Sequence, residues 1–290
     1  MKPPPFDYHA PATLDEAVAL LTTLDDAKVL AGGQSLVPLL NLRLAQFDHL
    51  IDVGRVDELQ GIERRNGSLW IGAATSQAAV ERSADVASAV PLLTRAAPLI
   101  GHVQIRNRGT IGGSIAHADP AAEIPAVALA LDATVEATSP HGRRTIAAAD
   151  LFTGFWSTSL ADDEVLSAVS FPVWSGRCGF AVEEVARRHG DFAIAGACVA
   201  VQLADDDAVQ RSAVSLFGLG ATPERAHGAE QSILGRPIEH VDAGAFGRAA
   251  VADLDSVPSD LNGAADYRRR IGATVVERAF GRAAEEARRG

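Results

Sequence analysis

The chain has 290 residues, of which 47% are hydrophobic and 22% are charged, a composition that excludes a disordered, collagenous or coiled-coil protein. The 26 basic and 37 acidic residues give a formal net charge of -11, so nucleic acid is not expected as a partner. The longest apolar runs, 124–131 and 193–201, fall far short of the roughly 20 residues that cross a bilayer, and residues 1–5 lack an apolar signal core. We therefore expect a cytoplasmic protein without a membrane-spanning segment.

Metal ligands are scarce in this sequence. The only cysteines are Cys178 and Cys198, they form no CxxC pair, and the eight histidines are not placed at ligand spacing. The sequence therefore predicts no iron–sulfur cluster and no metal site in this chain. Its chemistry must come from an organic cofactor or from acidic and basic side chains.

The first lobe is expected over residues 1–55. Thr13 and Glu16 form a capping box that begins a helix with an apolar face. A strand at 28–31 then leads directly into Gly32-Gly33-Gln34-Ser35, and a second apolar stretch at 49–53 completes a small βαβ-like lobe.

The second lobe is expected over residues 56–172. A strand at 68–73 precedes a helix that ends at Arg82, and a further helix at 86–100 is interrupted by Pro91 and Pro98. The segment Ile105-Arg-Asn-Arg-Gly-Thr-Ile-Gly-Gly-Ser114 is rich in glycine and arginine. After it, Asp119 is predicted to cap a helix over 121–131. Alternating residues predict strands at 134–138, 144–148 and 165–171.

Residues 173–290 are expected to form a third unit. Strands are predicted at 180–187, 193–203 and 212–219, and helices at 223–234, 242–254 and 264–288. Strands followed by helices indicate an α+β layer beside the two glycine-rich lobes.

The two glycine clusters have two possible interpretations. Glycine lets the backbone approach a ligand closely, and successive N–H groups can form an anion-binding nest. The cluster at Gly32 matches neither GxGxxG nor a P-loop, so a nicotinamide-binding Rossmann motif and a nucleoside-triphosphate site are both excluded there. The alternative is that both clusters are ordinary turns.

Three stretches resemble the FAD-binding medium subunits of molybdenum hydroxylases, in particular the medium chains of aerobic carbon monoxide dehydrogenase. They are Lys28-Val-Leu-Ala-Gly-Gly-Gln-Ser-Leu-Val-Pro38, the segment from Ile105 to Ser114, and Ala118-Asp-Pro-Ala-Ala-Glu-Ile-Pro125. The resemblance covers nearly the whole chain. It implies a two-lobed FAD-binding domain of the vanillyl-alcohol-oxidase (PCMH-like) type, followed by a C-terminal α+β domain with an antiparallel sheet and helices.

By position, the resemblance implies that both glycine segments hold the FAD pyrophosphate. Binding should be non-covalent, because Gln34 and Ser35 stand where covalent attachment would require a nucleophilic His or Cys. The residues expected to contact FAD in these two segments are Val29, Leu30, Ala31, Gly32, Gly33, Gln34, Ser35 and Leu36, and Thr110, Ile111, Gly112, Gly113 and Ser114.

The resemblance also assigns residues outside the glycine segments to the cofactor. Glu123 would accept a hydrogen bond from a cofactor hydroxyl, or it is only a first-turn acid favoured by the helix dipole. Ile100 and Leu166 would contact the flavin, although both also suit a core. Asp119 is a further candidate, with helix capping as the alternative.

Other polar residues beside the second glycine segment are also open to two interpretations. Arg106 and Arg108 would either neutralise phosphate or be solvated, and His117 would either approach the cofactor or be structural.

In the third unit, residues 187–193 match the family stretch that turns beside the isoalloxazine ring. Relatives often carry a Lys just before this stretch, whereas this chain has Glu183 and Glu184. A carboxylate there would disfavour an anionic reduced flavin, because like charges repel.

The implied function is electron transfer. The partners would be a large molybdenum-cofactor subunit and a small [2Fe-2S] subunit, in a dimer of heterotrimers, and FAD would pass electrons to an external acceptor. No catalytic acid or base is expected. Two alternatives are a stand-alone FAD-dependent oxidoreductase and a non-catalytic FAD-binding assembly module.

Overall fold

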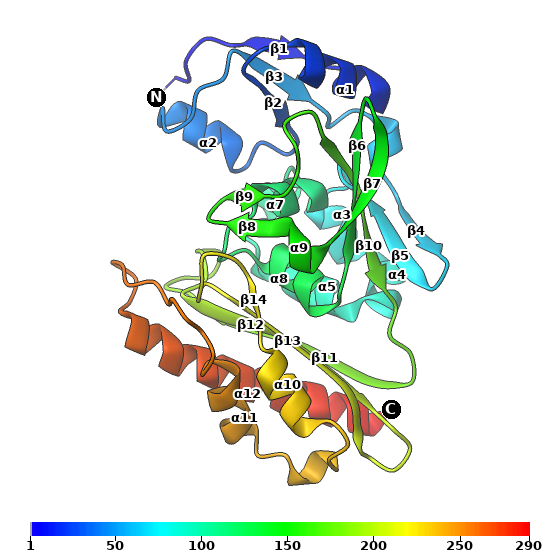
Figure 1. Cartoon of the computed structure of the whole chain (residues 1–290), viewed down its shortest axis with the longest axis vertical. Coiled ribbons are helices and arrows are strands. Elements are labelled where there is room, and N and C mark those ends of the chain that lie inside the picture. Colours follow the sequence, from blue (N-terminus) through cyan, green and yellow to red (C-terminus); the bar gives the residue numbers. More distant parts are fainter. Residues whose placement is uncertain (1) are drawn as a thin grey trace.

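The computed structural model describes residues 2–290, which form three units stacked from the N-terminus to the C-terminus (Figure 1). The first unit is a three-stranded parallel sheet with the strand order β1-β3-β2. Its elements are β1 (Asp7–His9), α1 (Leu14–Thr23), β2 (Ala27–Leu30), α2 (Leu36–Asn41) and β3 (His49–Asp52). β1 was not predicted, because three polar, largely exposed residues carry no strand signal.

The predicted capping box at the start of α1 is present with one change. The Thr13 hydroxyl accepts from the Glu16 amide at 3.2 Å, while the Glu16 carboxylate accepts from the amide of Ala12, one residue before the cap, at 2.7 Å. Both contacts satisfy amides that α1 cannot bond internally.

The second unit is built on a five-stranded antiparallel sheet with the order β4-β5-β10-β6-β7. The strands are β4 (Ile62–Arg65), β5 (Ser68–Gly72), β6 (Thr134–Ser139), β7 (Gly142–Ala147) and β10 (Val165–Pro172), and a separate hairpin pairs β8 (Phe152–Gly154) with β9 (Ser157–Thr158). The helices are η1 (Asp57–Leu59), α3 (Gln77–Arg82), α4 (Ala84–Ala89), α5 (Pro91–Ala96), η2 (Ala97–Leu99), α6 (Val103–Arg106), α7 (Ile111–His117), α8 (Glu123–Ala130) and α9 (Ala148–Leu151). The expected breaks at Pro91 and Pro98 are confirmed, since each proline begins or enters a new helical segment.

The third unit is a four-stranded antiparallel sheet whose outer face is covered by helices (Figure 1). Its elements are β11 (Arg177–Val185), β12 (Ala195–Leu203), β13 (Val209–Phe217), β14 (Glu224–Arg225), α10 (His227–Ile233), η3 (Ile238–His240), α11 (Ala243–Ala250) and α12 (Ala265–Arg289). The helix predicted at 223–234 is wrong in its first turn, because Glu224 and Arg225 pair with β13 as a short strand.

Alternation along β11 and β12 gives the third sheet two different faces. Ala181, Ala197 and Val199 pack with α12, whereas Phe180 and Cys198 join the core of the second unit. One hydrophobic core therefore continues from the second unit into the inner face of the third sheet, and this continuity fixes the two units against each other. The α+β class predicted from the sequence is confirmed. The domain limits 1–55, 56–172 and 173–290 stay predictions.

Candidate functional site

The two glycine segments lie against each other although they are far apart in the sequence, at residues 32–35 and 105–114. A Cβ atom on Gly32 would lie 2.2 Å from the carbonyl oxygen of Arg108 and 2.6 Å from the Cα of Gly109. Only glycine permits this approach of two backbones. The contact brings the turn after β2 beside the start of α7, where the first two units meet.

The first glycine segment leaves a run of backbone donors free. The amides of Gly32, Gly33, Gln34 and Ser35 donate to no acceptor among residues 2–290, and the Ser35 hydroxyl caps nothing. Gly33 has a φ of +72°, and the Gln34 side chain steadies the turn by donating to the Gly32 carbonyl at 2.9 Å. Half-buried N–H groups without partners suit a bound oxyanion, so the segment fits a diphosphate.

The second glycine segment is a helix start rather than an open loop. Thr110 caps α7 by accepting from the Gly113 amide at 3.0 Å, and the amides of Ile111 and Gly112 donate to Thr75 and Ala73 carbonyls at 3.0 and 2.9 Å. These amides are therefore already bonded. The Ser114 hydroxyl has no partner among residues 2–290, so it is a donor that this segment can offer a ligand.

Gly112 serves packing. A Cβ atom there would lie 2.4 Å from the Cβ and 2.8 Å from the Cα of Ala73. The residue is fully enclosed, so α7 approaches the end of β5 only because Gly112 has no side chain.

The predicted helix start at Asp119 is wrong. Asp119 accepts from the Ala121 amide at 2.9 Å and closes a turn, and α8 begins only at Glu123. The second carboxylate oxygen of Asp119 accepts from the Trp156 indole N–H at 3.2 Å. A local side-chain-to-backbone bond has thus competed successfully with the helix.

The remaining candidate contacts belong to the first two units. Leu166 is almost buried in β10, and Ile100, at the end of η2, packs against the same core. Val29 and Leu30 belong to β2, whose end leads into the first glycine segment. Glu123 is the first residue of α8 and is only 7% exposed.

The arginines beside the second glycine segment differ in environment. Arg106 pairs with Glu81 at 2.7 Å and donates to the carbonyls of Ile100 and Gly101, so it braces the segment and neither alternative, phosphate or solvent, applies to it. Arg108 is exposed.

An aromatic contact at the end of α7 was missed from the sequence. Trp156, in the β8–β9 hairpin, has a φ of +55°, and its ring stacks on that of His117 with centroids 5.8 Å apart. Burial lowers the pKa of His117, so this ring is neutral near pH 7. The adjacent aromatic residues Phe155 and Trp156, which lie between the strands predicted at 144–148 and 165–171, were the sequence feature that could have indicated this contact.

The third unit closes on this region through residues 187–193. A Cβ atom on Gly190 would lie 3.0 Å from the Gly101 carbonyl oxygen, and the rings of His102 and His189 lie 6.3 Å apart. Phe192 in the same segment is 70% exposed. This segment therefore flanks the same edge of the second unit as Ile100.

Glu183 and Glu184 point to opposite faces of β11. Glu183 pairs with Arg282 of α12, while Glu184 faces the second unit. Burial raises the pKa of Glu184 to about 7 and, together with the charge of Glu184, raises that of Glu123 to about 8. On the face toward the second unit, the only carboxyl of the two is therefore Glu184, which is partly charged near pH 7. The repulsion of an anionic reduced flavin is smaller than two charged carboxylates would cause.

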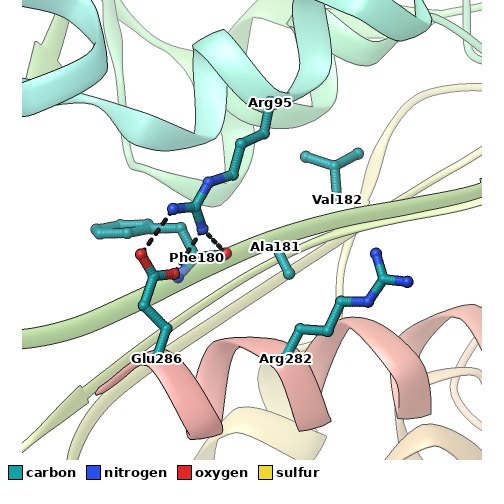
Figure 2. Close-up of a pocket in the computed structure, with 6 residues that line it drawn as sticks. All are labelled: Arg95, Phe180, Ala181, Val182, Arg282 and Glu286. Atoms are coloured by element: carbon teal, nitrogen blue, oxygen red, sulfur yellow. Dashed lines mark hydrogen bonds and ion pairs between the residues drawn. The ribbon is translucent and has the colours of Figure 1, made fainter. Parts of the chain in front are cut away.

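A small hollow between α5 and α12 is lined by side chains that hold the second and third units together (Figure 2). Arg95 donates to the two oxygens of Glu286 at 2.5 and 2.6 Å and to the Phe180 carbonyl, and Glu286 accepts from the Phe180 amide at 2.9 Å. Arg95 holds the pKa of Glu286 below its usual value. These groups satisfy one another and join the second unit to the third.

Among residues 2–290, no three His, Cys, Asp or Glu side chains are grouped to hold a metal ion, and no helix is long and apolar enough to cross a membrane.

Family comparisons match the two parts of the chain separately. A model described as the FAD-binding domain in molybdopterin dehydrogenase matches residues 4–174, and one described as the CO dehydrogenase flavoprotein C-terminal domain matches residues 180–283.

Similar proteins span the same length. The chain is 42% identical over 289 residues to the 6-hydroxypseudooxynicotine dehydrogenase complex subunit alpha of Paenarthrobacter nicotinovorans, covering 99% of this chain and 97% of that one. It is 40% identical over 281 residues to the carbon monoxide dehydrogenase medium chain of Hydrogenophaga pseudoflava, covering 97% of each.

Solved structures agree with these matches. Carbon monoxide dehydrogenase from Hydrogenophaga pseudoflava, in a form lacking the Mo-pyranopterin moiety, superposes with a TM-score of 0.95 at 40% identity over 99% of both chains. Quinoline 2-oxidoreductase from Pseudomonas putida 86 superposes with a TM-score of 0.94 at 33% identity, again over 99% of both.

Proposed function

We infer, because this chain belongs to the family of FAD-binding medium subunits of molybdenum hydroxylases, that it carries electrons between an iron–sulfur partner and an external acceptor. The chain is an oxidoreductase subunit that binds FAD. When bound, FAD accepts electrons singly and can release them in pairs.

The observation that carries the proposed cofactor position is the run of free amides from Gly32 to Ser35. Neutral N–H groups bind a diphosphate without requiring basic side chains, which suits a protein with a net charge of -11. We place the pyrophosphate there, with the Ser35 and Ser114 hydroxyls as further donors. Val29, Leu30, Ala31 and Leu36 line the same turn, and Thr110, Ile111, Gly112 and Gly113 hold the opposite wall.

The flavin end is proposed to lie toward the third unit. Ile100 and Leu166 supply apolar surface, and Glu123 supplies an acceptor for a cofactor hydroxyl. Asp119 is a weaker candidate, since both of its oxygens already accept hydrogen bonds. The binding is non-covalent, because neither cysteine lies in the glycine segments.

The proposed partners are a large molybdenum-cofactor subunit and a small [2Fe-2S] subunit, assembled as a dimer of heterotrimers in the cytoplasm. Exposed apolar side chains near both glycine segments offer a docking surface: Val37, Leu42 and Leu44 after the first, and Val103 and Ile105 before the second. Electron transfer needs close approach, so we place the iron–sulfur partner on this side.

Mixing experiments test this function. The FAD-loaded chain should be bleached anaerobically by its dithionite-reduced, desalted [2Fe-2S] subunit, and the replacement Val103→Asp should slow the bleaching without removing FAD. The absence of bleaching by the reduced partner would contradict the electron route.

Further measurements separate the alternatives. A chain that binds FAD but is bleached neither by the reduced [2Fe-2S] subunit nor by an added substrate would indicate a non-catalytic FAD-binding assembly module. Acid precipitation should release the flavin into the supernatant, and yellow colour in the washed pellet would contradict non-covalent binding.

A further inference from the structure

A buried polar seam lies between α8 and the inner face of the third sheet. Glu123 enters it from α8, and Glu184 enters it from β11, where it lies opposite Gly196. The seam is closed by a direct bond between the units, since the Gly218 amide donates to the Pro120 carbonyl at 2.7 Å. The two carboxyls therefore enter one seam from the two matched domains, where both lie near the buried Cys198 thiol and the charge of Glu184 acts on Glu123.

The sheet presents no cation to these carboxyls. Beside Glu184 on the same face lie Cys198, which is fully buried, and Ser215, whose buried hydroxyl has no partner. A Cβ atom on Gly196 would lie 2.1 Å from the Phe217 ring, so the aromatic ring fills this part of the seam. One oxygen of Glu184, Oε2, is buried without a hydrogen-bond partner.

Charged groups on the surrounding elements already have other partners. Arg95 of α5 binds Glu286, Arg225 of β14 binds Glu230 and Asp132, and Glu183 pairs with Arg282 on the far face. Arg268 of α12 donates to the Gly218 carbonyl at 2.9 Å and is paired with Asp260. Other titratable groups near the seam are Asp119, whose charge acts on Glu123, the Cys198 thiol, and His117, which stacks on Trp156.

Two carboxylates without a cation cannot both stay charged in such surroundings. The pKa directions agree with the geometry, since the pKa values of Glu123, Glu184 and Cys198 are all raised by burial. A proton on one carboxyl lowers the cost of burying the other.

We propose that Glu123 and Glu184 hold one proton between them across the domain boundary and that the pair binds a second proton from water when the bound flavin gains negative charge. The second half rests on the proposed function, which puts Glu123 at a cofactor hydroxyl. The step is balanced: one proton leaves solvent, one O–H bond forms on the pair, and no electron moves through the carboxyls.

The first experiment uses the chain without FAD. Infrared spectra in H₂O and D₂O at pH 7.5 should show the C=O band of a protonated carboxyl, which disappears in the double variant Glu123→Gln/Glu184→Gln. The variant Glu183→Gln is the matched control, because it alters the adjacent carboxyl on the other face, and it should keep the band. A missing band in the natural chain, or a band retained in the double variant, would overturn the shared proton.

The second experiment uses the FAD-loaded chain. The flavin midpoint potential is measured from pH 6 to 9. It should fall more steeply with pH in the natural chain and in Glu183→Gln than in the double variant. The difference in slope should correspond to one additional proton taken up for each two electrons. Equal slopes would overturn the coupling and leave FAD binding intact. A natural chain that binds no FAD contradicts the proposed function, and the infrared result then decides the shared proton alone.

Discussion

The two glycine segments are similar in composition, but their backbone amides differ in whether they have hydrogen-bond partners. Around Gly33 the turn leaves its amides without partners, whereas around Gly112 the amides are bonded to Thr75, Ala73 and Thr110. The difference arises from the elements that flank each segment, because the first turn projects from a strand end and the second begins a helix packed on β5. Glycine in the second segment therefore serves close packing, whereas in our proposal the turn around Gly33 in the first segment serves a ligand.

The largest effect is expected at Gly112. The replacement Gly112→Ala puts a methyl group 2.4 Å from Ala73, and overpacking there should lower the free energy of unfolding by about 3 kcal/mol. Urea unfolding measures the loss. Gly281→Ala is the control, because it has no atom within 4 Å and lies inside α12, so this change should stabilise the chain slightly. Equal stability of Gly112→Ala and the natural chain would contradict the packing role.

The next effect concerns the first segment. The replacement Gly33→Asp should weaken FAD binding by roughly 100-fold, about 2.7 kcal/mol, because a carboxylate repels the pyrophosphate, while the fold is retained. Asn and Asp both tolerate a positive φ, so Gly33→Asn is a control of similar shape without the charge. Flavin fluorescence titration measures the affinity for FAD, and far-UV circular dichroism measures whether the fold is retained. If Asp and Asn bind FAD alike, charge at Gly33 is not decisive.

The two sides of the proposed site should differ in how they respond to pH. The first glycine segment has no titratable side chain, whereas α8, on the other side, begins with Glu123. A carboxyl whose pKa is raised to about 8 by folding binds its proton preferentially in the folded chain. Its contribution is retained below pH 4.5 and is lost as pH rises toward 8. We expect the free energy of unfolding of the FAD-free chain to fall progressively over this range.

The variants of the acid pair make this pH effect specific. Because Gln cannot ionise, Glu123→Gln should flatten the decline in a series of urea titrations at different pH values. Glu183→Gln should keep the full decline. A pH profile unchanged by Glu123→Gln would assign the titration to other groups.

The smallest effects compare two hydroxyls. Removing one hydrogen bond should cost about 1 kcal/mol, so Ser35→Ala and Ser114→Ala are each expected to weaken FAD binding roughly fivefold. Neither hydroxyl has a protein partner among residues 2–290, so unfolding midpoints should not change. If only Ser35→Ala weakens FAD binding, the Ser114 hydroxyl does not bind the cofactor and the second segment has a packing role alone.

Much of the fold was predictable, because its signals are local. Alternating residues in β6, β7 and β10, the capping Thr13, and the breaks at Pro91 and Pro98 all depend on near neighbours. β1 and β14 were missed because short, half-exposed strands exist only through pairing with distant segments.

The candidate site divides in the same way. By itself the sequence determined the secondary-structure pattern, the glycine motifs and, through them, the family and its cofactor, since short motifs preserve local backbone requirements. Only the tertiary structure decided which amides stay free, which way Glu183 and Glu184 point, and that Glu184 and Glu123 enter the same buried seam. These depend on packing between residues far apart in the chain, where burial and the absence of a nearby cation set the protonation state.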